Sequence, residues 1–138
     1  MTNVEKVRRV YEAAAQDGLR AALAQLDDLA DPEIEFSPLL VRELEGRVLR
    51  GRDEVRGFFL DLDETLDGPR YEYAEAEEVV PDVVLAAIRL IGSGRTSAVP
   101  VDQELFLVFE FAAGRVRRIT AWSSREDAMT AVGKAAHA

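Results

Sequence analysis

Along residues 103–111 every second residue is apolar except the first, and the intervening residues include Glu104 and Glu110, a pattern that is typical of a β-strand with two different faces. The apolar side chains on one face are Leu105, Leu107, Phe109 and Phe111. Such a face must be buried, because exposing it to water is unfavourable. A turn at residues 112–114, followed by a second extended run, predicts a β-hairpin.

The opposite face of this strand mixes charged residues with bulky apolar ones. Phe106 and Val108 lie between Glu104 and Glu110, and a solvated sheet face would leave both exposed. We therefore expect the middle of this face to meet a second copy of the chain, which predicts a homodimer formed through the sheet. A simple solvated face is the alternative.

Residues 1–30 have the spacing of two short helices. Thr2 and Glu5 fit a capping box at the start of the first helix. Gly18 is the expected stop between the helices, and Asp31-Pro32 is the expected end of the second. Their apolar stripes consist of Val4, Val7, Tyr11 and Ala14 in the first helix, and of Leu19, Leu23, Leu26 and Leu29 in the second.

A third helix is predicted to begin near Gly51. Asp53 and Glu54 fall in its first turn, where acidic side chains complement the helix dipole. The tripeptide Asp-Gly-Pro at residues 67–69 is expected to end it. Its buried face would hold Val55, Phe58, Phe59, Leu62 and Leu66.

Most of the remaining sequence is predicted to be extended. Residues 33–36 alternate as a short strand that Ser37-Pro38 ends, and residues 39–50 are expected to hold a loop and a short strand. Residues 71–124 have the features of an antiparallel meander, with a turn at Pro81-Asp82.

Ser123 and Glu126 fit another capping box, which predicts a short terminal helix through Val132. Four glutamates of the first long strand (Glu72, Glu75, Glu77 and Glu78) are expected to be solvated, although a bulge would turn one of them inward. With its helices separate from a curved sheet, the chain is predicted to belong to the α+β class.

Composition narrows the function classes. With 138 residues, 48% of them hydrophobic, the chain fits a single domain over residues 1–138. Its 17 basic and 26 acidic residues give a net charge of −9, which disfavours nucleic acid and membranes as partners. Cysteine is absent and the one histidine is His137, so neither a metal site nor a cofactor is expected. No segment has the length and hydropathy of a membrane span, and a cytoplasmic location is expected.

Three segments together resemble the SnoaL-like polyketide cyclase branch of the nuclear transport factor 2-like superfamily, to which ketosteroid isomerase is related. They are VRRVYEAAAQDGL at residues 7–19, LEGRVLRGRDEVRGFF at residues 44–59 and FEFAAGRVRRITAWSSREDAM at residues 109–129. The resemblance implies a cone in which a strongly bent antiparallel or mixed sheet wraps over three helices of the N-terminal half. It also implies an apolar pocket at the wide end and a frequent dimeric state.

The resemblance carries over to the catalytic residues only in part. Members related to ketosteroid isomerase use a tyrosine on the first helix, which matches Tyr11, and an acidic base after the first strand. The corresponding place here is Phe36-Ser37, so the base does not carry over. SnoaL-like cyclases use an acidic residue on the sheet, often with a histidine, where this chain has Leu105, Leu107 and Phe109. The catalytic residues are therefore unknown.

Four residues allow both a pocket role and a structural one. Tyr11 would donate a hydrogen bond in the pocket or belong to the core. Arg89, within the apolar run VVLAAIRLI, would bind an anionic ligand, pair with an internal carboxylate or lie at an interface. Gln103 would lie at the pocket mouth or end a strand, and Trp122 would form a pocket wall or fill the core or dimer interface. The predicted pocket residues are Tyr11, Phe36, Phe59, Arg89, Gln103, Leu105, Leu107, Phe109 and Trp122.

Three functions fit this sequence. The first is a cone domain that binds a hydrophobic carbonyl compound without catalysis. The second is an active isomerase, cyclase or hydrolase that uses an inward carboxylate, and the third is a module that binds another protein. The missing histidine and acidic base favour the first, and an inward carboxylate would favour the second.

Overall fold

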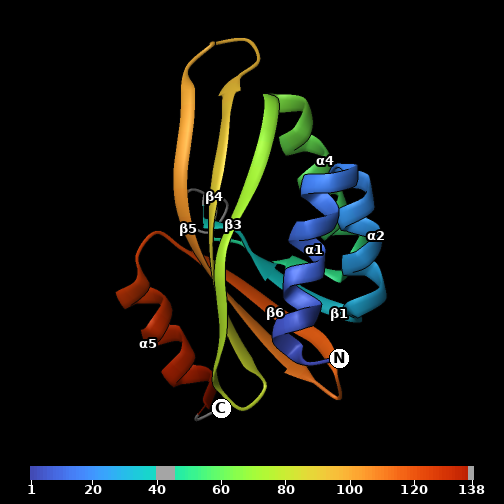
Figure 1. The fold of residues 1–138 in the computed structure, drawn as a ribbon, viewed down its shortest axis with the longest axis vertical. Coiled ribbons are helices and arrows are strands. Elements are labelled where there is room, and N and C mark those ends of the chain that lie inside the picture. Colours follow the sequence, from blue (N-terminus) through green and yellow to red (C-terminus); the bar gives the residue numbers. More distant parts are fainter. Residues whose placement is uncertain (40–45, 137–138) are drawn as a thin grey trace.

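The structure is a computed structural model that describes residues 1–39 and 46–136. Within these residues, six strands form one sheet in the spatial order β2-β1-β6-β5-β4-β3 (Figure 1). The strands are β1 (Ala30–Ser37), β2 (Leu49–Arg50), β3 (Leu66–Val80), β4 (Val83–Gly94), β5 (Pro100–Ala112) and β6 (Arg115–Trp122). Neighbouring strands are antiparallel except β1 and β6, which are parallel. The predicted α+β class with a curved, mixed sheet is confirmed.

Helices cover the two faces of the sheet unequally. Three helices, α1 (Asn3–Asp17), α2 (Leu19–Leu29) and α4 (Gly51–Thr65), lie on one side, which we call the inner face (Figure 1). The last helix, α5 (Arg125–Ala136), lies on the opposite side, the outer face. No helix in the described part of the chain is both long and apolar enough to cross a membrane.

The ends of α1 and α2 follow from local side-chain chemistry. Thr2 Oγ1 accepts a hydrogen bond from the backbone amide of Glu5 at 3.1 Å, which is the predicted cap of α1. Gly18 separates the two helices with a φ of 90°, a conformation that favours glycine. The predicted end of α2 was two residues too late: the helix ends at Leu29, and Asp31-Pro32 lie in β1.

Two further element boundaries differ from the prediction. Helix α4 ends at Thr65, and residues 67–69 lie in β3, where the pairing with β4 is irregular between Asp67 and Arg70. Pro69 lies in this irregular stretch. It is tolerated because β3 is an edge strand, where a missing backbone N–H need not cost a hydrogen bond of the ladder. Helix α5 is capped by Ser124, whose Oγ accepts from the amide of Asp127 at 3.1 Å, and not by Ser123.

The segment 39–50 was predicted to hold a loop and a short strand. Strand β2 at Leu49–Arg50 is that short strand, paired with β1. Residues 40–45 of the same segment lie outside the described residues.

The side chains of β5 point alternately to the two faces of the sheet and pack into two separate hydrophobic clusters. Leu107, Phe109 and Phe111 are buried on the inner face together with Val7 and Tyr11 of α1, and Leu105 packs against the same cluster. The prediction that this face of β5 is buried is confirmed. The four glutamates of β3 that were expected to be solvated (Glu72, Glu75, Glu77 and Glu78) are all exposed.

The outer face of β5 is covered by the chain itself. Phe106 is 8% exposed and Val108 is fully buried, because Ala128 and Val132 of α5 lie over them. The premise that a single chain would leave Phe106 and Val108 in water is therefore wrong. The predicted homodimer loses that argument and stays a prediction.

Glu35 lies on the outer face of β1 between two arginines. Its carboxylate pairs with Arg50 and, at 3.2 Å, with Arg118. Partial burial by itself would raise the pKa of Glu35, but Arg118 and Arg50 outweigh it, and the pKa is lowered. A group with a lowered folded-state pKa adds stability above its unfolded pKa and loses it as the pH falls through the folded value.

We therefore expect Glu35→Gln to remove part of the acid sensitivity of this fold. The variant should be less stable than the wild type at pH 7 and approach it as the pH falls below the ordinary glutamate value of 4.5. Thermal unfolding measured between roughly pH 7 and pH 3 tests this, with the exposed Glu77→Gln as control. A constant difference between Glu35→Gln and the wild type across this range would contradict the assignment.

Candidate functional site

The inner face of the sheet and the three helices enclose a cavity of about 490 Å³. This volume lies within the range of pockets that hold small organic ligands. Helices α1 and α2 contribute Val10, Tyr11, Ala14, Leu19, Ala22, Leu23 and Leu26 to its wall. Strand β1 and α4 with their adjoining residues contribute Phe36, Pro38, Leu39, Phe58, Phe59, Leu62 and Thr65. The later strands contribute Leu66, Tyr71, Ile88, Leu90, Val101, Gln103, Leu105, Leu107, Phe109, Ile119 and Ala121.

None of the described residues that line this cavity carries a charge. The polar ones among them are Tyr11, Thr65, Tyr71 and Gln103. Two of these already have partners, since Thr65 Oγ1 donates to the carbonyl of Asp61 at 2.9 Å and Gln103 Nε2 donates to the carbonyl of Glu104 at 3.0 Å. The two tyrosine hydroxyls are the remaining polar groups in the lining, and Gln103 keeps a second Nε2 hydrogen and its Oε1 for a ligand at the exposed end.

Tyr71 has a hydroxyl group that is buried without a hydrogen-bond partner. Burial, together with the nearby carboxylate of Asp63, raises the pKa of Tyr71 to about 12. Burial also raises the pKa of Tyr11, with a further contribution from Tyr71. Both hydroxyls therefore keep their protons at neutral pH and remain hydrogen-bond donors.

Aromatic rings form the wall beside the Tyr71 hydroxyl. The ring of Phe59 lies between Phe36, at a centroid distance of 5.4 Å, and Tyr71, at 6.4 Å. Phe58 packs edge-on against both phenylalanines at 5.8 and 5.4 Å. These contacts join β1, α4 and β3, so the rings both shape the cavity and fix α4 relative to the sheet.

The exposure of the lining residues indicates that the cavity mouth lies between the end of α4 and the start of β5. Among the described lining residues, Thr65 and Gln103 are the exposed ones, and Leu62 and Val101 beside them are partly exposed. Gln103 lines the cavity and is exposed, which fits the pocket-mouth role that the sequence left open beside that of an ordinary strand end.

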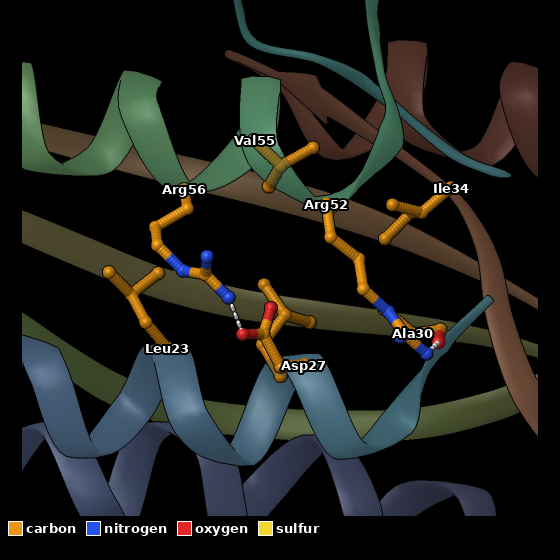
Figure 2. Close-up of a pocket in the computed structure, with 8 residues that line it drawn as sticks. Leu23, Asp27, Ala30, Ile34, Arg52, Val55 and Arg56 are labelled. Carbon is orange, nitrogen blue, oxygen red and sulfur yellow. Dashed lines mark hydrogen bonds and ion pairs between the residues drawn. The ribbon is translucent and has the colours of Figure 1, made fainter. Parts of the chain in front are cut away.

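A second, much smaller space lies between α2 and α4 (Figure 2). Its volume of about 10 Å³ is enough for one water molecule and too small for an organic ligand. Asp27 of α2 pairs there with Arg56 of α4, and Arg52 donates to the carbonyl of Ala30 at the end of α2 (Figure 2). These polar contacts link α2 and α4 beside the small space.

Seven of the nine predicted pocket residues line the cavity, and two do not. Those that do are Tyr11, Phe36, Phe59, Gln103, Leu105, Leu107 and Phe109. Arg89 was a wrong prediction: it lies exposed on the outer face, where its Nε and Nη2 donate to Asp102 at 2.5 and 3.3 Å. Trp122 does not line the cavity either: it packs against the outer cluster under α5, which is the core role that the sequence left open, and donates its Nε1 hydrogen to Thr120.

The sequence analysis missed Tyr71, the residue with the most distinctive chemistry in the cavity. A signal for it was present, because Tyr71 alternates with Glu72 and an exposed glutamate predicts an inward neighbour. The described residues contain no group of three or more His, Asp or Glu side chains that could hold a metal ion.

Solved structures of other proteins share this fold. A nuclear transport factor 2-like protein of unknown function from Burkholderia pseudomallei is 17% identical, with 94% of this chain and 97% of that chain covered and a TM-score of 0.73. A putative SnoaL-like polyketide cyclase from a Jannaschia species is 22% identical, with 94% and 90% covered and a TM-score of 0.71. A protein with a ketosteroid isomerase-like fold from Catenulispora acidiphila, in complex with trimethylamine, is 14% identical, with 90% and 88% covered and a TM-score of 0.69.

No protein-family model matches the sequence, and no functionally curated protein matches it either. The structural matches cover nearly the whole chain, so the chain has the nuclear transport factor 2-like fold that the resemblance implied. At these levels of identity the likeness establishes the fold and leaves the function to the chemistry of the cavity.

Proposed function

We propose that this domain binds a neutral, largely apolar small molecule that carries an acceptor oxygen, such as a carbonyl group. The observation that carries the proposal is an apolar cavity of about 490 Å³ whose wall includes Tyr71, a residue with a buried hydroxyl that has no hydrogen-bond partner. A buried donor without a partner is costly, and an acceptor on the ligand would remove that cost.

The lining also indicates which ligands are disfavoured. A charged ligand would lose its hydration on entry, and the described lining residues offer no opposite charge to compensate. A flat, apolar ligand would contact the aromatic wall of Phe36, Phe59 and Tyr71 on one side. Aliphatic side chains of β5, Leu105 and Leu107, add apolar contacts from another part of the lining.

Binding is better supported than catalysis. The two tyrosine hydroxyls could hold the developing negative charge of an enolate, which is one half of an isomerase or cyclase mechanism. The other half needs a base, and the described lining residues include no carboxylate or histidine. The predicted interaction module receives little support from the middle of the outer face, because α5 occupies it.

The experiment uses acedan, a neutral fluorescent naphthyl ketone, and an analogue in which an ethyl group replaces the acetyl group. We expect acedan to bind with a blue-shifted emission, and Tyr71→Phe to weaken its binding about 3- to 10-fold, the effect of one neutral hydrogen bond of about 0.5–1.5 kcal/mol. Binding of the ethyl analogue should be the same in both proteins. Fluorescence titration measures all four affinities.

Tyr71→Phe should leave the free protein as stable as before or more stable by up to about 1 kcal/mol, because it removes a buried donor without a partner. Thermal unfolding of the unliganded variant therefore separates lost recognition from lost folding. Equal weakening of acedan and the ethyl analogue would contradict the proposed role of the hydroxyl. Failure of both compounds to bind the wild-type protein would contradict the proposed ligand class.

A further inference from the structure

One surface arginine holds the far end of α4. Arg95 lies in the turn between β4 and β5, and its backbone amide donates to the carbonyl of Thr65 at 2.9 Å. Its side chain adds bonds from Nε to the carbonyl of Glu64 at 2.9 Å, and from Nη2 to those of Asp63 at 3.3 Å and Leu66 at 3.1 Å. A single residue thus contacts four consecutive carbonyl groups.

These carbonyls belong to the last turn of α4 and the residue that follows it. The final carbonyls of a helix have no partner inside the helix and must be satisfied from outside. An arginine near the C-terminal end of a helix also interacts favourably with the helix dipole. Arg95 therefore caps the C-terminal end of α4 and stabilises it, although it lies about thirty residues further along the sequence than its partners Glu64 and Leu66.

The position of this cap gives it a second consequence. Leu62 and Thr65 of the same helical turn line the mouth of the cavity on one side, and Val101 and Gln103 of β5 line it on the other. Arg95 lies in the turn that leads into β5 and bonds to the end of α4, so it ties the two sides of the mouth together. In Figure 1 the upper end of α4 lies beside the start of β3, close to the hairpin formed by β4 and β5.

The chain just beyond α4 is poorly suited to hold this distance by itself. Gly68 has a φ of 58°, and the pairing of β3 with β4 is irregular between Asp67 and Arg70. Leu66 and Asp67 pair with Gly94 and Ser93, and regular pairing is interrupted between Asp67 and Arg70, so this short irregular stretch is a joint between the end of α4 and the rest of β3. The side-chain bonds of Arg95 bridge this joint.

We propose that Arg95 is a positioning residue that sets the width of the cavity mouth and so controls how fast a ligand enters and leaves. This inference rests on the proposed binding function. Arg95 does not line the cavity, so the bound ligand makes the same contacts with or without its side chain. The residue therefore acts on the barrier to exchange and leaves the equilibrium affinity nearly unchanged.

Stopped-flow fluorescence with acedan tests this inference on the full chain. We expect Arg95→Ala to raise the association and dissociation rate constants together, by about fivefold or more, while the dissociation constant changes by less than about twofold. Arg95→Lys keeps the charge but loses the planar fork that reaches several carbonyls, and it should change both rates in the same direction by a smaller factor. Arg95 is exposed, so both variants retain the buried core.

Arg52→Ala is the matched control. Arg52 also donates to a carbonyl at a helix end, that of Ala30 after α2, but it lies beside the small space between α2 and α4 and does not line the large cavity (Figure 2). If lost capping alone mattered, Arg52→Ala and Arg95→Ala would alter the exchange rates alike, in proportion to their losses in thermal stability. That result would overturn the inference.

Two other results would also overturn it. Unchanged rates in Arg95→Ala would show that the mouth does not depend on this residue. A faster dissociation with an unchanged association rate would place Arg95 in the binding wall instead of at its entrance. Absence of acedan binding to the wild-type protein would be a failure of the proposed function, and it is distinguished by the titration before any variant is measured.

Discussion

Phe106→Glu is expected to lower the free energy of unfolding by about 3 kcal/mol or more, without changing the oligomeric state of the protein. Phe106 is 8% exposed in the single chain, beneath α5, and a carboxylate at this place would be taken out of water. The substitution also removes an aromatic side chain from a packed cluster. Arg125 lies over the Phe106 ring at 5.3 Å and would offset part of this cost by pairing with the new carboxylate.

Ala128→Glu tests the contact between α5 and β5 from the side of the helix. Ala128 is fully buried on α5, so a longer, charged side chain there should cost at least about 2 kcal/mol by overpacking and by loss of hydration. Glu104→Ala, on the uncovered part of the same strand face, is the control and should change stability by less than about 0.5 kcal/mol.

Urea denaturation at two protein concentrations, together with sedimentation velocity, distinguishes the two roles of this face. If α5 is the cover, Phe106→Glu and Ala128→Glu both unfold at lower urea, and the midpoints do not depend on concentration. If Phe106 lies in an interface between two chains, Phe106→Glu instead converts a dimer into a stable monomer. The second outcome would restore the argument for dimerisation through the middle of the sheet.

Filling the cavity is expected to abolish ligand binding while the fold is preserved. Leu105→Trp on β5 and Ala14→Phe on α1 enlarge side chains on two opposite walls, and both residues line the cavity. We expect the double variant to bind acedan at least 100-fold more weakly, a loss of about 2.7 kcal/mol. Because the new rings extend into empty space and gain contacts there, thermal stability should be equal or higher.

Val99→Trp provides the control for this variant. Val99 lies at the tip of the hairpin between β4 and β5 and is 59% exposed, so an added indole there does not reach the cavity. Its acedan affinity should equal that of the wild type. Normal binding by the filled variant would mean that acedan occupies the surface of the protein, and the cavity would lose its proposed role.

The inward-facing side chains could be predicted from the sequence on β5 but not on β4. On β5, residues 105–109 are all apolar, but Glu104 and Glu110 both lie on the face opposite Leu105, Leu107 and Phe109, so the inward direction of these three residues could be predicted. On β4, residues 83–88 are apolar at every position and buried on both faces, so the pattern carried no direction. Arg89 was therefore assigned to the wrong face.

By itself the sequence determined the order of the helices and strands and which face of β5 is buried. Tertiary structure decided what covers each buried face: α5 lies over Phe106 and Val108, where a second chain had been expected. It also decided that the inner face encloses a cavity, with the hydroxyl of Tyr71 buried in its wall. The physical reason is that the hydrophobic effect has no direction. An apolar pattern shows that a surface must be buried, but only the folded chain shows which residues pack against it.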